Sequence, residues 1–132
     1  MHILLSFIPL LFLFVLHAAY VKLSAAVMGR SLVSWKHSFL FAGLVILVTL
    51  IERIGSVLTG ISMPLTVALI YGIALQLALG SWFFSTRGTT RNGQRFGWRG
   101  GAQLSAITVA LLGITFFGLQ GIVRIAGIAG QP

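Results

Sequence analysis

The sequence has no cysteine and only one acidic residue, Glu52, among its 132 residues. The lack of cysteine excludes disulfides, thiolate metal sites and cysteine nucleophiles. With one carboxylate in the chain, catalysis by a pair of carboxylates within one subunit is excluded as well. The sequence contains no P-loop, no HExxH zinc motif, no nucleophile elbow and no dinucleotide fingerprint. These absences predict a protein that is not an enzyme and holds no cofactor.

Charged residues of either sign are scarce: they make up 8% of the chain, against 58% hydrophobic residues. The mean hydropathy is +1.04. Soluble domains carry about 25% charged residues, and disordered chains combine low hydrophobicity with high charge. The composition therefore predicts an all-α integral membrane protein that forms a single domain over 1–132.

Long uncharged runs predict three membrane-spanning helices, at about 3–21, 64–84 and 102–123. A span needs about 20 mainly apolar residues to cross about 30 Å of hydrocarbon. The apolar segment 38–51 is shorter and, taken alone, would be a re-entrant or interfacial helix. Extended to 38–60 it becomes long enough to cross, with Glu52 and Arg53 inside it.

The distribution of basic residues favours four spans. Short loops rich in Lys and Arg stay cytoplasmic, and four spans put the basic segments 22–37 and 85–101 on one side. The prediction is a four-transmembrane-helix bundle in the inner (plasma) membrane of a bacterium, with both termini outside. A short exterior hairpin joins the middle spans, and 85–101 forms a longer basic cytoplasmic loop. No Lys or Arg precedes the first run, which argues against a cleaved signal peptide.

Glu52 falls in the outer half of the second span. Intramembrane charges normally face the bundle or a water-filled cavity. On a helical wheel the polar residues of this half occupy an arc of about 120°, which we expect to point inward; they are Glu52, Arg53, Ser56, Thr59 and Gly60. Reflecting the hairpin about residue 62 brings Tyr71 to the depth of Glu52, where its hydroxyl can donate to the carboxylate.

Two interpretations of Glu52 stay open. As an ion- or proton-coupling group, it would bind a cation or alternate between charged and neutral forms, with Arg53 and Tyr71 beside it. As a structural residue, it would only be neutralised by a neighbour, with Arg53 extended toward the exterior head groups. Of the three histidines, His17 and His37 differ in depth by about 6 Å, and no carboxylate lies on their side, so no metal or haem site is expected.

The segment 85–101 contains four arginines, spaced four residues apart, and five glycines. Glycine disfavours helix by about 1 kcal/mol per residue, so we expect a flexible loop. Its contacts would be anionic lipid head groups or the acidic surface of a partner protein, made by Arg87, Arg91, Arg95, Arg99 and Trp98. Nucleic acid is not expected as a partner, because membrane orientation already accounts for the basic residues.

Small residues, with one glutamine, recur at intervals of four residues along the last two spans, with a glycine one turn further on in the second of them, and they would allow close helix packing. The stripes are Ala68, Gly72, Gln76 and Gly80 in one, and Ala102, Ala106, Ala110 and Gly113 in the other. They can face neighbouring helices within the chain or a second copy in a homo-oligomer.

The functional prediction is a non-catalytic accessory, assembly or scaffold component of the membrane. The alternative is an oligomeric ion- or proton-coupled transporter or channel subunit that uses Glu52. Four helices rarely enclose a transport path alone, so the alternative requires self-association or a larger membrane complex.

Overall fold

The computed structural model describes residues 2–29 and 31–129. Its elements are α1 (His2–Val27), β1 (Ser31–Leu32), α2 (Trp35–Thr59), α3 (Leu65–Arg87), β2 (Thr89–Thr90) and α4 (Gly97–Ala129). Within these described ranges, four helices are long and apolar enough to cross a membrane. The prediction of four apolar spans is confirmed, and the uncertain segment 38–51 lies within one continuous helix, α2.

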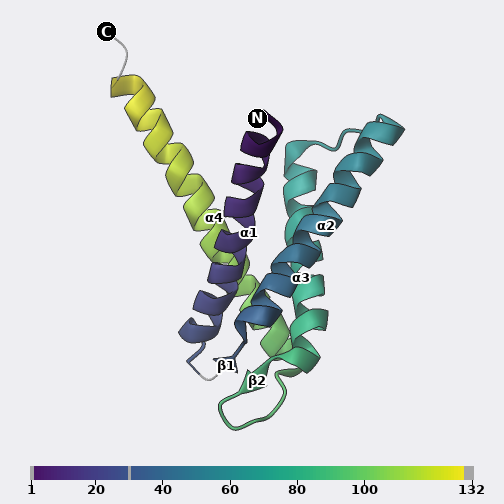
Figure 1. Ribbon diagram of the computed structural model, residues 1–132, viewed down its shortest axis with the longest axis vertical. Helices are drawn as coiled ribbons and strands as arrows, with labels where there is room; N and C mark the ends of the chain where they lie inside the picture. Colours follow the sequence, from purple (N-terminus) through teal and green to yellow (C-terminus); the bar gives the residue numbers. More distant parts are fainter. Residues whose placement is uncertain (1, 30, 130–132) are drawn as a thin grey trace.

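The two ends of the bundle differ in their connections (Figure 1). The α1–α2 and α3–α4 connections lie together at one end, where β1 pairs with β2 in antiparallel register, Ser31 opposite Thr90 and Leu32 opposite Thr89. We call this the strand end. The start of α1, the α2–α3 connection and the end of α4 lie at the other end, which we call the open end.

Local signals explain where α2 begins and ends. The Ser34 side chain accepts a hydrogen bond from the backbone N–H of His37 and so caps the first turn. At the other terminus, Gly60 adopts the left-handed conformation with φ of 66°, which glycine reaches without a steric penalty. Pro64 then precedes the first residue of α3, so the predicted short hairpin between the middle spans is present.

The expectation of a flexible loop over 85–101 is wrong at both ends of the segment. Helix α3 continues to Arg87, and α4 already begins at Gly97. Between them β2 enters a tight turn, in which the N–H of Gly93 donates to the carbonyl of Thr90 (2.9 Å) and Gly93 has φ of 78°. The glycines here serve close contacts and turn geometry, because a Cβ at Gly88 would collide with the Phe96 ring.

The core occupies the strand-end half of the bundle. Its large, fully buried apolar side chains come from every helix, and they are Val21, Phe41, Phe84 and Leu104. Helices α3 and α4 approach most closely where Gly101 faces the backbone of Ser81.

The predicted small-residue stripes have different outcomes. In α3, Gly80 is buried against Ser105 of α4, as the stripe predicts. Ala68 and Gly72 of α3 and Ala106 and Ala110 of α4 are exposed. They do not pack within this chain, and their role in a homo-oligomer stays a prediction. The buried face of α4 consists of Gly101, Leu104, Ser105 and Thr108. The close approach at Gly101 sets the rotation of α4 and turns the alanines outward.

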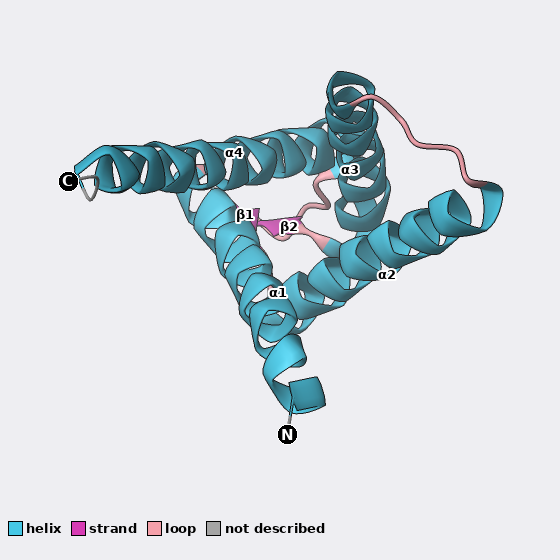
Figure 2. Ribbon diagram, turned by 90° about the horizontal axis from the view of Figure 1, so that it is seen from above, coloured by secondary structure: helices cyan, strands magenta, loops and turns pink. Residues whose placement is uncertain are grey.

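Toward the open end the helices diverge, as Figures 1 and 2 show for α2 against α3 and for α4 against the other helices. The open-end half of α4 carries exposed apolar side chains such as Ile114, Phe117 and Ile122. At 33 residues, α4 is about 50 Å long. The length of α4 is enough to cross the hydrocarbon thickness of about 30 Å.

Candidate functional site

A cavity of about 230 Å³ lies between α2 and α3, on the open-end side of the core. Most of its lining is apolar, and the polar side chains in its wall are Thr49, Glu52 and Gln76. The cavity thus contains the only carboxylate side chain of the sequence. Sites for small ligands combine an apolar lining with a few convergent polar groups in this manner.

The Glu52 side chain is half-buried, and its Oε1 atom is inaccessible to water. Among the described residues, this oxygen has no hydrogen-bond partner. A buried polar atom without a partner is costly, and in hydrocarbon no bulk water is available to supply one. A proton, a cation or a water molecule in the cavity can satisfy this oxygen.

That the arc points inward stays a prediction for its other members, which lie in the open-end half of α2, where the helices diverge. Arg53, Ser56 and Thr59 are all exposed. The Ser56 hydroxyl donates to the Arg53 carbonyl (2.9 Å) and the Thr59 hydroxyl to the Gly55 carbonyl (2.8 Å). Because these hydroxyls are satisfied within α2 and the helices diverge, no neighbouring helix has to cover them.

Tyr71 is 46% exposed and makes no hydrogen bond to Glu52 in the part of the chain described here. Its neighbour Gly72 lines the cavity instead, and an added Cβ at Gly72 would have no atom within 4 Å. The α3 wall beside Glu52 is therefore bare backbone at this depth. The space next to the carboxylate follows directly from this glycine.

Gln76 connects the cavity to the interior of the bundle. It lines the cavity, and its Nε2 lies 3.3 Å from Nε2 of His17 on α1. In this arrangement the amide N–H donates and the imidazole nitrogen accepts, which a neutral histidine allows. His17 is buried, and its ring centroid lies 5.8 Å from that of Phe41. A buried imidazole next to the cavity is a feature that reasoning from spacing alone did not assign to a site.

Hydroxyl groups continue the polar contacts from α3 and α1 to α4. The Ser105 hydroxyl donates to the Gln76 carbonyl (2.8 Å), and the Ser24 and Thr108 hydroxyls lie 2.9 Å apart. Tyr20 on α1 also hydrogen-bonds to Thr115 on α4. We call this set, with His17, the polar seam. Hydrogen bonds between helices stabilise membrane bundles modestly, on average by about 0.6 kcal/mol each.

An aromatic cluster of Phe41, Phe83 and Phe84 packs between α2 and α3 in the strand-end half of the bundle. These side chains are buried, and their ring centroids lie 4.8 to 5.5 Å apart. Ring contacts at such distances are close and well packed. These rings belong to the buried core on the strand-end side of the cavity.

The four arginines predicted to contact lipid or a partner lie near the strand end, but on different elements. Arg87 ends α3, and its guanidinium covers the Phe83 ring at 4.6 Å. Arg91 and Arg95 belong to the turn between β2 and α4, and Arg99 lies in the first turn of α4. All four are exposed, as is Trp98. Because they belong to three different elements, the four arginines do not lie along one face of a single helix.

Among the described residues, no group of three His, Cys, Asp or Glu side chains could hold a metal ion. His37 lies near the strand end, where its Nδ1 is 2.9 Å from the Ser34 hydroxyl. Comparisons with protein-family models, curated proteins and solved structures found no match to this chain. The chemistry of the cavity, the polar seam and the basic turn therefore supports the functional inference.

Proposed function

We propose that this chain is a subunit of an oligomeric ion- or proton-coupled transporter or channel, and that Glu52 binds the proton or small cation. The observation that carries this proposal is the buried, unpartnered Oε1 atom beside a cavity. Inside a bilayer a carboxylate must be neutralised by a proton or paired with a cation. Both states are available to a side chain with free space beside it.

Polar groups beside Glu52 support both its protonated state and its cation-bound state. Thr49 and Gln76 supply polar atoms to the cavity that can orient a hydrated cation or a water molecule next to Glu52. The contact of Gln76 with His17 extends the polar path from the cavity to the centre of the bundle. Access therefore runs from the open end, and passage to the strand end requires the aromatic cluster to rearrange.

Self-association is part of the proposal. The cavity lies between two helices that diverge toward the open end, so one chain does not enclose a continuous path. Apolar side chains on the open-end half of α4 are exposed and available for contact with another chain. A second copy of the chain, or a larger membrane complex, would close the path.

We place the protein in the bacterial plasma membrane with the strand end in the cytoplasm. The basic residues near the strand end are Lys22, Lys36, Arg87, Arg91, Arg95 and Arg99. Arg53 and Arg124 belong to the open-end halves of their helices. This asymmetry supports the orientation through the retention of basic loops in the cytoplasm. The exposed Trp35, Trp82 and Trp98 then lie at the cytoplasmic head groups.

The second candidate is a non-catalytic accessory, assembly or scaffold component. The exposed basic turn favours it, because Arg91, Arg95 and Arg99 are free to bind anionic head groups or an acidic partner surface. This function makes no demand on Glu52. The two candidates therefore differ in whether the carboxylate is needed.

Proton flux in sealed vesicles tests the proposal. The full chain is reconstituted with an internal pH-sensitive dye, and a potassium diffusion potential drives protons. We expect flux in the parent protein, loss of flux in Glu52→Gln, and partial flux in Glu52→Asp, which keeps a carboxylate. Arg124→Gln is the control for a charge change in the same half of the bundle. Flux that survives Glu52→Gln, or a parent protein no more active than empty vesicles with both protons and alkali cations, would overturn the proposal and leave the second candidate.

A further inference from the structure

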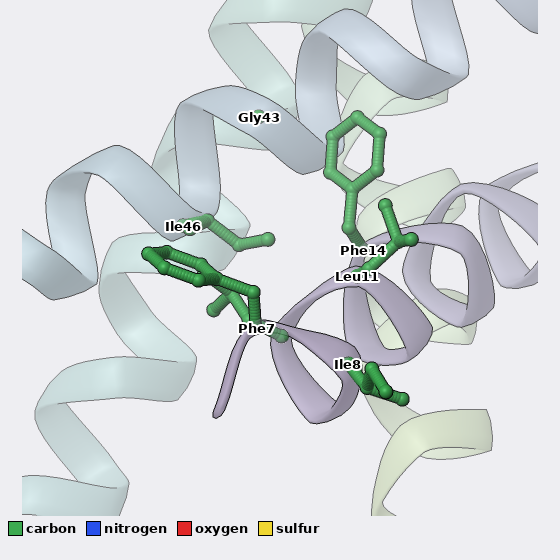
Figure 3. A pocket seen from close by; sticks show the side chains of 7 residues that line it. Phe7, Ile8, Leu11, Phe14, Gly43 and Ile46 are labelled. Atoms are coloured by element: carbon green, nitrogen blue, oxygen red, sulfur yellow. The ribbon is translucent and has the colours of Figure 1, made fainter. Parts of the chain in front are cut away.

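An apolar groove runs along the outside of the contact between α1 and α2, away from the Glu52 cavity. It consists of two adjoining hollows of about 610 and 510 Å³ that share Phe14 and Gly43 in their linings. Figure 3 shows the hollow nearer the open end, where Phe7 of α1 lies opposite Ile46 of α2 and Phe14 lies near Gly43. The two hollows therefore adjoin at Phe14 and Gly43, and we call them together the groove.

A single cation stands at the strand-end limit of this groove. Lys36 lines the hollow nearer the strand end and is exposed in the first turn of α2. In the described part of the chain, its ammonium group has no hydrogen bond or ion pair. Lys22, the other lysine nearby, differs, because its Nζ donates to the Val33 carbonyl (2.6 Å) and lies over the Trp35 ring. Lys36 is therefore free to bind an anion from the surroundings.

The length of the groove fits one lipid chain. From Lys36 to Leu47, its last α2 residue toward the open end, the helix rises about 16 Å. Half of a hydrocarbon core of about 30 Å is about 15 Å. A lipid whose phosphate meets Lys36 would thus extend its acyl chain to the bilayer centre within the groove.

We infer that this groove binds one anionic phospholipid of the strand-end leaflet, with its phosphate on Lys36 and an acyl chain across Gly43. At Gly43 the groove is lined by backbone, and the Phe14 ring lies 3.6 Å from the position that a Cβ would take. The positive charge of Lys36 at one end of the groove matches the phosphate of such a lipid. The apolar walls, which extend over the length of a single leaflet, match its acyl chain. The inference is independent of the role of Glu52.

Retention of lipid by the purified full chain tests the inference. The protein is incubated in micelles with equimolar phosphatidylglycerol and phosphatidylcholine that have identical acyl chains, and retained lipids are counted by native mass spectrometry. We expect the parent protein to retain one phosphatidylglycerol in preference. Lys36→Gln is expected to lower that preference about fivefold, the contribution of one cation near a membrane surface. Gly43→Leu is expected to abolish retention of both lipids, because its side chain fills the groove.

Two matched controls separate the groove from general effects. Arg124→Gln removes the same charge from the exposed open-end half of α4 and is expected to leave the preference unchanged. Gly118→Leu adds the same side chain on an exposed face of α4 that has no atom within 4 Å of a new Cβ, and it is expected to retain lipid. Equal losses in Lys36→Gln and Arg124→Gln would show diffuse attraction and overturn the inference. Retention by Gly43→Leu, or a parent dimer that Gly43→Leu dissociates, would overturn it as well.

Discussion

Replacing Gly101 by alanine tests how α3 and α4 hold together. A Cβ at this position would lie 2.8 Å from the carbonyl oxygen of Ser81, 3.0 Å from its Cα and 3.1 Å from the carbonyl oxygen of Gly80. All three atoms belong to the backbone of α3, so no side chain can rotate away to make room. The two helices must move apart to accept the methyl group.

The size of the effect follows from these contacts. Non-bonded heavy atoms prefer separations of about 3.5 Å or more, so the closest contact is short by about 0.7 Å. Overpacking usually costs about 1 to 3 kcal/mol, and rigid backbone on the other side places Gly101→Ala in the upper part of that range. The better helix propensity of alanine returns at most about 1 kcal/mol. We expect a net loss of about 1 to 2 kcal/mol in the free energy of unfolding.

Unfolding in mixed micelles with rising dodecyl sulfate, followed by circular dichroism and tryptophan fluorescence, measures this loss. Gly118→Ala in the same helix is the control, because a Cβ there has no atom within 4 Å. The control is expected to match the parent protein or to exceed it by up to about 1 kcal/mol. If Gly101→Ala is as stable as Gly118→Ala, the close approach of the two helices does not exist in the folded protein.

Three further predictions concern the polar seam, the cavity and the orientation. A double-mutant cycle of Ser24→Ala and Thr108→Val is expected to give a coupling of about 0.6 kcal/mol in the same unfolding assay, and no coupling would remove this pair from the seam. Glu52→Leu is expected to leave the free energy of unfolding unchanged or to raise it, since a buried oxygen without a partner is lost; a loss above about 1 kcal/mol would reveal a stabilising partner within the chain. Because the chain has no cysteine, single cysteines can report orientation: a membrane-impermeant maleimide applied to whole cells is expected to label Ser62→Cys and spare Gly93→Cys, and the reverse pattern would invert the topology.

The helices were predictable because membrane spans depend on one strong signal, the length of an uncharged run. Gly60 and Pro64 also mark the α2–α3 connection clearly, since one favours the left-handed conformation and the other cannot continue a helix. The position of Glu52 next to the α3 wall followed from helix periodicity and the reflection of the hairpin. These features depend on residues near one another in sequence.

The failed predictions concern contacts between distant segments. The number of glycines in 85–101 indicates a flexible loop. In the structure, however, Gly88 and Gly101 lack a side chain because a Cβ would collide with the Phe96 ring at Gly88 and with the backbone of α3 at Gly101. The rotation of α4 depends on the same close approach, which a count of small residues does not reveal. Spacing did contain a signal for the polar seam, since His17, Tyr20 and Ser24 follow the i, i+3, i+7 pattern of one helix face.

The structure separates the parts that stabilise the bundle from the part that we propose to be functional. In the strand-end half, the hydroxyls of Ser24, Ser105 and Thr108 all have hydrogen-bond partners, and the large apolar side chains are buried. In the open-end half, Glu52 keeps an oxygen without a partner beside empty space. If stability alone determined the residue at this position, an apolar side chain would serve it better. The unsatisfied carboxylate is therefore the observation on which the proposed binding of a proton or a cation rests.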